Sequence, residues 1–499
     1  MRSLENGRGA VDKHARVDED GELDCVRGRF VTRQKMGDVI VLLPGILGSV
    51  LEREGKEVWA PTPGAALRAL WTLGRSFTGL RLDGNDPVDV DDLDGVTATR
   101  LMPDVHIIPG LWGIDGYSSV SAMITATFDV VAGRTFIEFP YDWRRDNRVA
   151  ARQLAERALP ALHEHRKANP DAKLVLIGHS MGGLVARYFL ECLDGWKDTR
   201  MLITFGTPYR GSLNAVGFLA NGFEKRVGPF KVADLSTLLR SLTSVYQLLP
   251  IYPCIDEGDG KLVRPGETSR VKHLDPSRAG AAERDFHRAI EKAVAAREAT
   301  DPYTIHPIVG LTQATKQSAR LLSDGKVELF ATYEGEDLGG DGTVPRVSAT
   351  PIELDDRSVD QGVYAPERHA SLQNALSVQT QLRGLLAPVE DRERFRDARG
   401  GLNLLLDDLF AGGEDIPMQV VADVRRLSLA ATVVDLHRRR PVAGPLPLTL
   451  GEDQLTHHLD LPPLPPDIYG VEVSPVGGSA GSAQPVHGVF VVAGDDEPE

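Results

Sequence analysis

Cysteine is scarce in this sequence, with three residues among 499. They are Cys25, Cys192 and Cys254, which lie far apart along the chain. An odd, scattered set provides neither a disulfide framework nor the Cys-x-x-Cys spacing of a metal site. Buried or inert thiols in a reducing compartment are the simplest interpretation. We therefore expect a fold that is stabilised by its hydrophobic core rather than by cross-links.

The chain also lacks a long apolar run. Its best apolar stretch, residues 39–51, is interrupted by Pro44, Gly45 and Gly48. It is shorter than the roughly 20 apolar residues that cross a bilayer. Residues 1–36 are rich in charge and contain no apolar segment of the kind found in secretion signals. From these two absences we expect cytoplasmic residence.

Positive charge is in deficit, because 56 Lys and Arg residues face 71 Asp and Glu residues, a formal net charge of −15. A nucleic-acid partner is not expected, since such binders usually present a basic face. General attraction to anionic lipid is also disfavoured, although a local apolar surface could still make transient contact with a membrane or micelle. A length of 499 residues predicts more than one domain.

Short apolar runs alternate with amphipathic segments through residues 37–387. The predicted strands are 38–43, 135–139, 173–177, 201–205, 303–309 and 327–333, and the predicted helices are 147–168, which Pro160 either kinks or divides, 181–193 and 369–386. This order predicts an α/β fold with a mostly parallel sheet and covering helices. Residues 213–250 differ, because their apolar residues recur at near-helical spacing without strand character. That segment is either a helical lid or ordinary core.

The composition changes after residue 387. Residues 389–399 are dense in charge, which is typical of a linker or a surface helix, and residues 388–415 are predicted to be a linker. Residues 416–495 contain short alternating segments separated by turns rich in proline and glycine. This pattern is typical of a small immunoglobulin-like β-sandwich. The predicted organisation is thus a charged lead-in (1–36), an α/β domain (37–387), a linker and an all-β domain whose ligand is left open.

Gly178-His179-Ser180-Met181-Gly182 matches the G-x-S-x-G pattern of a nucleophilic serine. It follows an apolar run and opens a predicted helix, which is the context that the pattern requires. We expect the two glycines because side chains there would collide with neighbouring backbone in a strained strand-to-helix turn. The alternative is a serine that only caps a helix. We interpret His179 as a packing or hydrogen-bonding neighbour and not as the base.

Catalysis by such a serine needs two main-chain N–H groups that stabilise a developing oxyanion. One is expected from Met181, the residue after the nucleophile, and the other from the loop that follows the first strand. Residues 44–48 form that loop, and Ile46 is the predicted donor, with Leu47 as its rival. The alternative is that the glycines of this loop only form a turn.

In α/β-hydrolases the acid and the base follow the serine in that order. Asp341 is the predicted acid, because it lies between Gly340 and Gly342 in residues 339–345. Glu336 and Asp337 are alternative candidates, but glycines do not flank them on both sides. The alternative interpretation of an Asp-Gly pair is a surface turn.

Five of the 13 histidines follow Asp341, and four of them lie in the predicted all-β domain: His437, His457, His458 and His487. His369 is therefore the predicted base. It would deprotonate Ser180 for attack on an ester carbonyl, while Asp341 fixes the imidazole tautomer. This mechanism requires neither a metal nor an organic cofactor.

Four segments resemble the lecithin:cholesterol acyltransferase and phospholipid:diacylglycerol acyltransferase family: residues 41–52, 140–144, 178–183 and 340–345. Residues 108–110 and 246–250 resemble it more weakly, and the likeness spans roughly residues 38–386. It implies an α/β-hydrolase fold and transfer of an acyl group from a lipid ester to serine, then to water or an alcohol. It also implies an oxyanion donor at Ile46, a lid at 213–250 and a buried ion pair between Asp142 and Arg144.

The chain departs from eukaryotic members in its extra all-β domain and its lack of a secretion signal and a disulfide pattern. These departures disfavour a lipoprotein or lysosomal setting and a sterol acceptor. Two other functions fit the same motifs: a soluble carboxylesterase or peptidase, and a hydrolase-like module that binds without catalysis.

Overall fold

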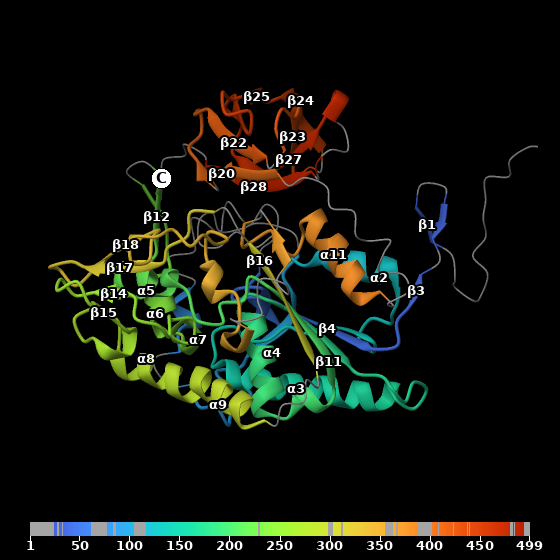
Figure 1. Ribbon diagram of the computed structural model, residues 1–499, viewed down its shortest axis with the longest axis vertical. Coiled ribbons are helices and arrows are strands. Elements are labelled where there is room, and N and C mark those ends of the chain that lie inside the picture. The colour runs from blue at the N-terminus through green and yellow to red at the C-terminus, as the bar shows by residue number, and fades with distance from the viewer. Residues whose placement is uncertain are drawn as a thin grey trace, which may run out of the picture.

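The computed structural model describes the chain with several gaps. The described residues are 24–26, 29–31, 33–60, 77–82, 86–103, 116–227, 230–297, 303–310, 313–354, 363–365, 368–387, 402–407, 409–422, 424–436, 438, 440–479, 483 and 485–493. They form an α/β unit and a C-terminal all-β unit, each with its own hydrophobic core (Figure 1). No helix in these ranges is both long and apolar enough to cross a bilayer.

The α/β unit is built on a six-stranded sheet in which every neighbouring pair is parallel. Its strands, in spatial order, are β19 (Val363–Ala365), β16 (Thr304–Gly310), β11 (Thr199–Phe205), β10 (Leu174–His179), β4 (Val39–Leu43) and β9 (Phe136–Glu138). The central strands are continuous buried runs, as expected for a parallel sheet covered on both faces. The predicted α/β class is confirmed.

Helices cover both faces of this sheet (Figure 1). Helices α3 (Asn147–His165) and α4 (Met181–Cys192) pack together on one face, and α9 (Arg288–Ala296) packs against α4. On the other face α2 (Ser118–Thr127) contacts α11 (Leu376–Leu386). Helix α3 begins where the Asp146 side chain accepts a hydrogen bond from the N–H of Arg148, and it continues as one helix through Pro160.

The last predicted helix was placed too early, because α11 begins at Leu376 and not at residue 369. Residues 369–374 form consecutive turns instead. The N–H of His369 donates to the carbonyl of Asp341, and the Gln373 amide donates to the carbonyls of Gly116 and Ala370. A regular helix over residues 369–374 would point these N–H and amide groups in other directions and would lose these hydrogen bonds.

The predicted strand at 327–333 is shorter than expected and lies outside the main sheet. It is β18 (Val327–Phe330), which pairs antiparallel with β17 (Ser318–Leu321) across a short loop that contains an Asp-Gly pair. With β14 (Ile255–Asp256) and β15 (Leu262–Val263) these strands form a small separate sheet. The main sheet ends instead at β19, whose three residues gave no periodic signal.

The apolar segment 213–250 contains helices α5 (Leu213–Ala220), α6 (Ser236–Ser241) and α7 (Thr243–Tyr246). The expectation that it has no strand character was wrong, because β12 (Glu224–Val227) pairs with β13 (Phe230–Asp234). Gly222, with a φ of 80°, follows α5 and turns the chain out of helical geometry. In the sequence, Gly228 and Pro229 then separate the two strands, as expected for residues between paired strands.

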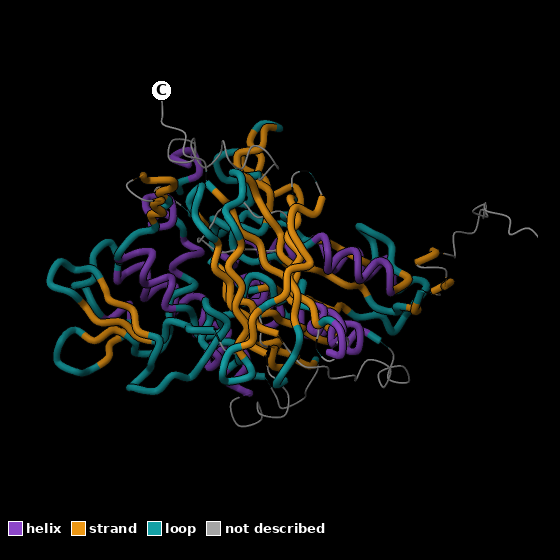
Figure 2. Tube along the Cα trace, turned by 90° about the horizontal axis from the view of Figure 1, so that it is seen from above, coloured by secondary structure: helices purple, strands orange, loops and turns teal. Residues whose placement is uncertain are grey.

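The C-terminal unit consists of two sheets that share one core, and most of their neighbouring strands are antiparallel. One contains β20 (Leu402–Leu406), β22 (Ile416–Ala422), β26 (Thr456–Leu461) and β25 (Thr449–Leu450), and the other β21 (Leu409–Phe410), β28 (Val486–Val492), β27 (Asp467–Pro475), β23 (Leu429–Asp435) and β24 (Arg440–Pro447). This unit starts within the predicted linker, because Leu402, Leu404 and Leu406 alternate into its core. Figure 2 shows its strands from above.

Smaller elements complete the described chain. They are β1 (Asp24–Val26), β2 (Arg29–Val31) and β3 (Gln34–Lys35) within the predicted lead-in, β5 (Ser49–Arg53), β6 (Lys56–Trp59), β7 (Val96–Leu101), β8 (Phe128–Asp129), α8 (Pro276–Ala282) and the short helical turns Phe77–Leu80, Gly195–Lys197, Pro265–Glu267, Glu283–His287, Arg346–Ser348, Ile352–Leu354 and Gly477–Ser479. Residues 108–110, which weakly resemble the family, lie outside the described residues.

Candidate active site

Ser180 occupies the sharp turn between β10 and α4. Its φ of 52° and ψ of −121° are strained for a residue with a side chain, as expected for a nucleophile turn. A Cβ at Gly178 would lie 2.6 Å from the Gly183 Cα, and one at Gly182 would lie 2.4 Å from the Pro44 carbonyl oxygen. The predicted reason for both glycines is therefore confirmed.

Three buried side chains form a hydrogen-bonded chain at this turn. The Nε2 of His369 lies 2.9 Å from the Oγ of Ser180, and its Nδ1 lies 2.7 Å from the Oδ2 of Asp341. They come from distant segments: Ser180 follows β10, Asp341 lies on the connection from β16 to β19, and His369 follows β19. Since the carboxyl ends of parallel strands meet at one edge of a sheet, this topology gathers them.

The Asp341 carboxylate also fixes the protonation pattern. Its Oδ1 accepts hydrogen bonds from the N–H groups of Thr343 (2.9 Å) and Val344 (2.7 Å). Its Oδ2 can only accept, so the Nδ1 of His369 carries the hydrogen. In the neutral imidazole, Nε2 is then the acceptor for the Ser180 hydroxyl. This is the arrangement of a general base poised at a nucleophile.

The rival residues lie elsewhere. Asp337 accepts hydrogen bonds from the Gln317 amide (2.8 Å) and the Gly339 N–H (2.9 Å), and the main chain of Glu336 bonds with that of Tyr333. Of the later histidines, His457 and His458 lie on β26 and His487 lies on β28, whereas His437 is outside the described residues.

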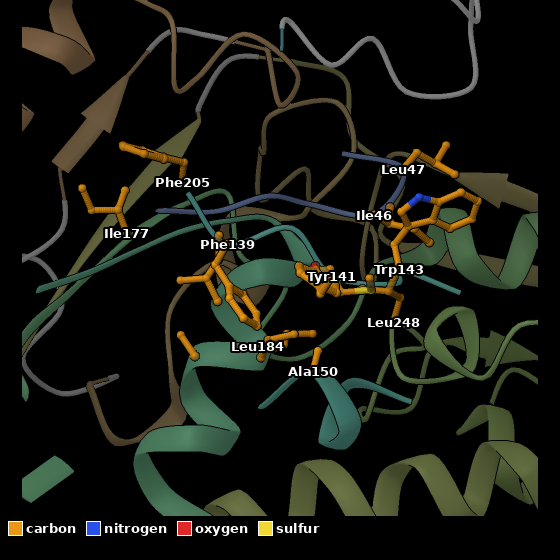
Figure 3. Close-up of a cluster of buried hydrophobic side chains, with 14 of the residues drawn as sticks. Ile46, Leu47, Phe139, Tyr141, Trp143, Ala150, Ile177, Leu184, Phe205 and Leu248 are labelled. Carbon is orange, nitrogen blue, oxygen red and sulfur yellow. The ribbon is translucent and has the colours of Figure 1, made fainter. Parts of the chain in front are cut away.

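Four buried aromatic side chains hold the main chain of the predicted oxyanion loop, residues 44–48, and of Ser49 directly after it. Their bonds are Tyr141 Oη to the Pro44 carbonyl (2.8 Å), the Gly45 N–H to Tyr117 Oη (2.7 Å), Trp59 Nε1 to the Leu47 carbonyl (3.1 Å) and Trp143 Nε1 to the Ser49 carbonyl (3.2 Å). Figure 3 shows Tyr141 and Trp143 beside Ile46 and Leu47. Side chains, and not a regular element, therefore set the shape of this loop.

The middle of the loop keeps its N–H groups available. The Gly48 N–H bonds to the Gly45 carbonyl at 3.0 Å, but the N–H groups of Ile46 and Leu47 donate to no group in the described part of the chain. Leu47 has a φ of 64°, a left-handed conformation that is strained for a leucine. The Trp59 bond to its carbonyl helps to hold it there. The other predicted donor, Met181, is the first residue of α4, where helical N–H groups have no intrahelical partner.

The sequence pointed to only some of the four aromatic side chains that hold the oxyanion loop. Tyr141 and Trp143 lie in segment 140–144, whose resemblance to the family implies a role for Asp142 and Arg144 alone. Tyr117 and Trp59 were missed, since Tyr117 is 72 residues from Gly45 in the chain and neither belongs to a recognisable motif.

The predicted ion pair between Asp142 and Arg144 is present. The fully buried Arg144 guanidinium lies 2.6 Å from an Asp142 oxygen and 3.0 Å from an Asp94 oxygen. Burial by itself would lower the pKa of Arg144, but the bonds to Asp142 and Asp94 outweigh it and raise that pKa above its usual value. The pair fastens the segment that carries Tyr141 and Trp143.

We expect Arg144→Met to lower the free energy of unfolding by about 3 kcal/mol, because two carboxylates lose their buried partner. Urea unfolding followed by tryptophan fluorescence would measure it, since none of the five tryptophans lies in the C-terminal unit. Arg100→Met is the matched control, as its half-exposed pair with Glu57 should contribute less than about 1 kcal/mol. Equal losses for the two variants would contradict a stabilising role for the buried pair.

Comparison with known proteins identifies a matching family. Residues 115–326 match the lecithin:cholesterol acyltransferase model, a range that includes the serine turn but not residues 44–48, Asp341 or His369. Lecithin-cholesterol acyltransferase-like 4 of Arabidopsis thaliana is 28% identical over 42% of this chain and 42% of that protein. Lysosomal phospholipase A and acyltransferase of Homo sapiens is 34% identical over 22% of this chain and 27% of that protein.

The chain thus spans less than half the length of each of these curated relatives. Among solved structures, the mature form of the Bacillus licheniformis lipase BlEst2 is 14% identical, and the match covers 70% of this chain and 92% of that chain with a TM-score of 0.34.

Proposed function

We propose, from the premise that this chain belongs to the lecithin:cholesterol acyltransferase family, that it is an enzyme which moves the acyl group of a lipid ester through an acyl-enzyme on Ser180. The observation that carries this proposal is the hydrogen-bonded chain from Ser180 through His369 to Asp341. A serine that only capped a helix would have no use for a correctly protonated imidazole and a buried carboxylate.

The chemistry follows from the atoms in place. His369 Nε2 takes the proton of the Ser180 hydroxyl while Oγ forms a bond to the ester carbonyl carbon. The protonated ring, stabilised by Asp341, then gives that proton to the departing alcohol as the ester C–O bond breaks. Water or a second alcohol next attacks the acyl-enzyme while His369 Nε2 takes its proton. The bond between the acyl carbon and Ser180 Oγ then breaks, and His369 returns the proton to Oγ, which restores the serine hydroxyl. No step needs a metal or an organic cofactor.

Stabilisation of the oxyanion is assigned to the N–H groups of Met181 and Ile46, with Leu47 as the rival to Ile46. Ile46 and Leu47 are supported by the loop geometry, because aromatic side chains bond to neighbouring main-chain groups while the N–H groups of these two residues remain available. Met181 is supported by its place at the start of α4. A loop held in this way needs no rearrangement when charge develops, which is the source of the catalytic advantage of such sites.

A lipid ester is the proposed substrate class, because the curated relatives are named as acyltransferases and phospholipases. Such substrates reside in membranes or micelles, so transient contact with their surface is part of the proposal. The apolar segment 213–250, with α5 almost wholly buried, is the proposed wall for the acyl chain.

Product analysis tests both the reaction and the substrate. The protein is incubated with phosphatidylcholine vesicles carrying a labelled acyl chain, with and without a long-chain alcohol. We expect loss of the labelled acyl group from the phospholipid. Labelled fatty acid alone would identify a hydrolase, and a new labelled ester would identify a transferase. Turnover confined to water-soluble p-nitrophenyl acetate would overturn the lipid assignment in favour of a soluble carboxylesterase.

A further inference from the structure

A second series of hydrogen bonds lies next to the one that joins Ser180, His369 and Asp341. The Gly45 N–H lies 2.7 Å from Tyr117 Oη, the same Oη lies 2.8 Å from His179 Nδ1, and His179 Nε2 lies 3.1 Å from the carbonyl oxygen of His369. All three contacts are buried. These hydrogen bonds therefore connect the backbone of the oxyanion loop, at Gly45, with the backbone of the base, at His369.

Chemistry fixes the direction of every bond in this chain. A carbonyl oxygen only accepts, so Nε2 of His179 carries the hydrogen that it donates to His369. Nδ1 of a neutral ring is then an acceptor and takes the hydrogen of the Tyr117 hydroxyl, whose oxygen in turn accepts from the Gly45 N–H. Only one arrangement of hydrogens satisfies all of these groups.

His179 remains neutral throughout. Burial, and then the positive charge that His369 can carry, lower the pKa of His179 to about 3. Burial also raises the pKa of Tyr117, so its hydroxyl keeps its hydrogen. The ring centroids of His179 and His369 are 5.2 Å apart, yet Nδ1 of His179 is occupied by Tyr117 and cannot compete for the proton of Ser180.

We propose that Tyr117 and His179 are positioning residues for acyl transfer: together they hold the oxyanion loop and the catalytic base at a fixed separation on either side of Ser180. This inference rests on the proposed function of Ser180. It explains why a histidine and a tyrosine occupy two fully buried positions. Apolar substitutes would leave the Gly45 N–H and the His369 carbonyl buried without partners.

The two ends of this series of hydrogen bonds lie at backbone groups next to the proposed catalytic groups. Gly45 directly precedes the proposed oxyanion donor Ile46, and the His369 carbonyl belongs to the residue whose imidazole is the proposed base. A shift of either main chain would separate donors and base from the reacting carbonyl. Displacements of about 1 Å in such sites lower rates by about 100-fold.

The test is a double-mutant cycle with Tyr117→Phe, His179→Phe and the double variant. For each we measure kcat and KM for labelled phosphatidylcholine, the rate of Ser180 labelling by a fluorophosphonate and the melting temperature. We expect each single variant to lose about 10- to 100-fold in kcat with little change in KM. The double variant should lose about as much as one single variant, because the residues act as one chain.

Tyr209→Phe is the control, since Tyr209 is also buried and its hydroxyl is also hydrogen-bonded, in this case to the side-chain hydroxyl of Thr204. It should keep wild-type kcat while sharing any general effect of a lost buried hydroxyl on the melting temperature. If Tyr117→Phe fails to fold, His179→Phe decides alone, because it preserves the bond between Gly45 and Tyr117.

Two results would overturn the inference: kcat and labelling rates of the variants that match Tyr209→Phe, or single losses that multiply in the double variant. Failure of the proposed function is a different outcome. In that case Ser180→Ala would still be labelled, or the wild type would not be. Labelling that depends on Ser180 but is insensitive to Tyr117 and His179 removes the positioning role alone.

Discussion

Ser180→Ala is expected to lower kcat for lipid-ester turnover by about 10⁶-fold. The substitution removes the Oγ that is proposed to form the acyl-enzyme, while His369, Asp341 and the oxyanion loop stay in place. A small residual rate above that in water should persist, because the N–H donors and bound substrate still favour attack by water. Labelled phospholipid assays and fluorophosphonate labelling followed by mass spectrometry would measure the loss and locate the adduct.

Ser244→Ala provides the control for this prediction. Ser244 is fully buried and its hydroxyl donates to the carbonyl of Arg144 rather than to the imidazole. It should retain kcat and labelling, with a loss in unfolding free energy of about 1 kcal/mol. A wild-type rate in Ser180→Ala would show that another nucleophile acts, and equal loss in both variants would point to a general effect on folding.

The parts of the fold that could be predicted are those with strong local signals. Buried strands such as β4 and β10 appear as short continuous apolar runs, and the serine turn has glycines that its geometry requires. Asp341 and His369 were found because the order of the chain in this fold restricts the choice. The structure brings these two side chains to Ser180 at hydrogen-bonding distances.

The parts that escaped prediction depend on contacts that no local pattern records. Strand β18 has the composition of a sheet strand, but its partner is chosen by the hairpin that joins it to β17. Strand β19 is three residues long and exists through its pairing with β16. The bond between Tyr117 and Gly45 joins segments far apart in the chain. Each of these features depends on contacts between segments that are distant in the chain, and such contacts leave no clear pattern in a single sequence.

The second large effect is expected at Asp341, whose two oxygens have different partners. Oδ1 accepts from the N–H groups of Thr343 and Val344, so in Asp341→Asn the amide oxygen must take that place. The amide NH₂ then faces Nδ1 of His369 at the position of Oδ2. Nδ1 can respond only as an acceptor, which moves the ring hydrogen to Nε2, where it points at Ser180. The imidazole is then unable to take the serine proton.

We therefore expect Asp341→Asn to lower kcat by about 10⁴-fold with little change in KM or melting temperature, because the loop bonds at Oδ1 survive while the tautomer is wrong. Asp337→Asn is the matched control from the same loop, as Asp337 bonds to Gln317 and Gly339 rather than to the imidazole, and it should keep near-wild-type kcat. A loss of less than about tenfold in Asp341→Asn would contradict the tautomer argument. A large loss in Asp337→Asn would instead assign the effect to the shape of the loop, since both variants alter its side chains but only one faces the base.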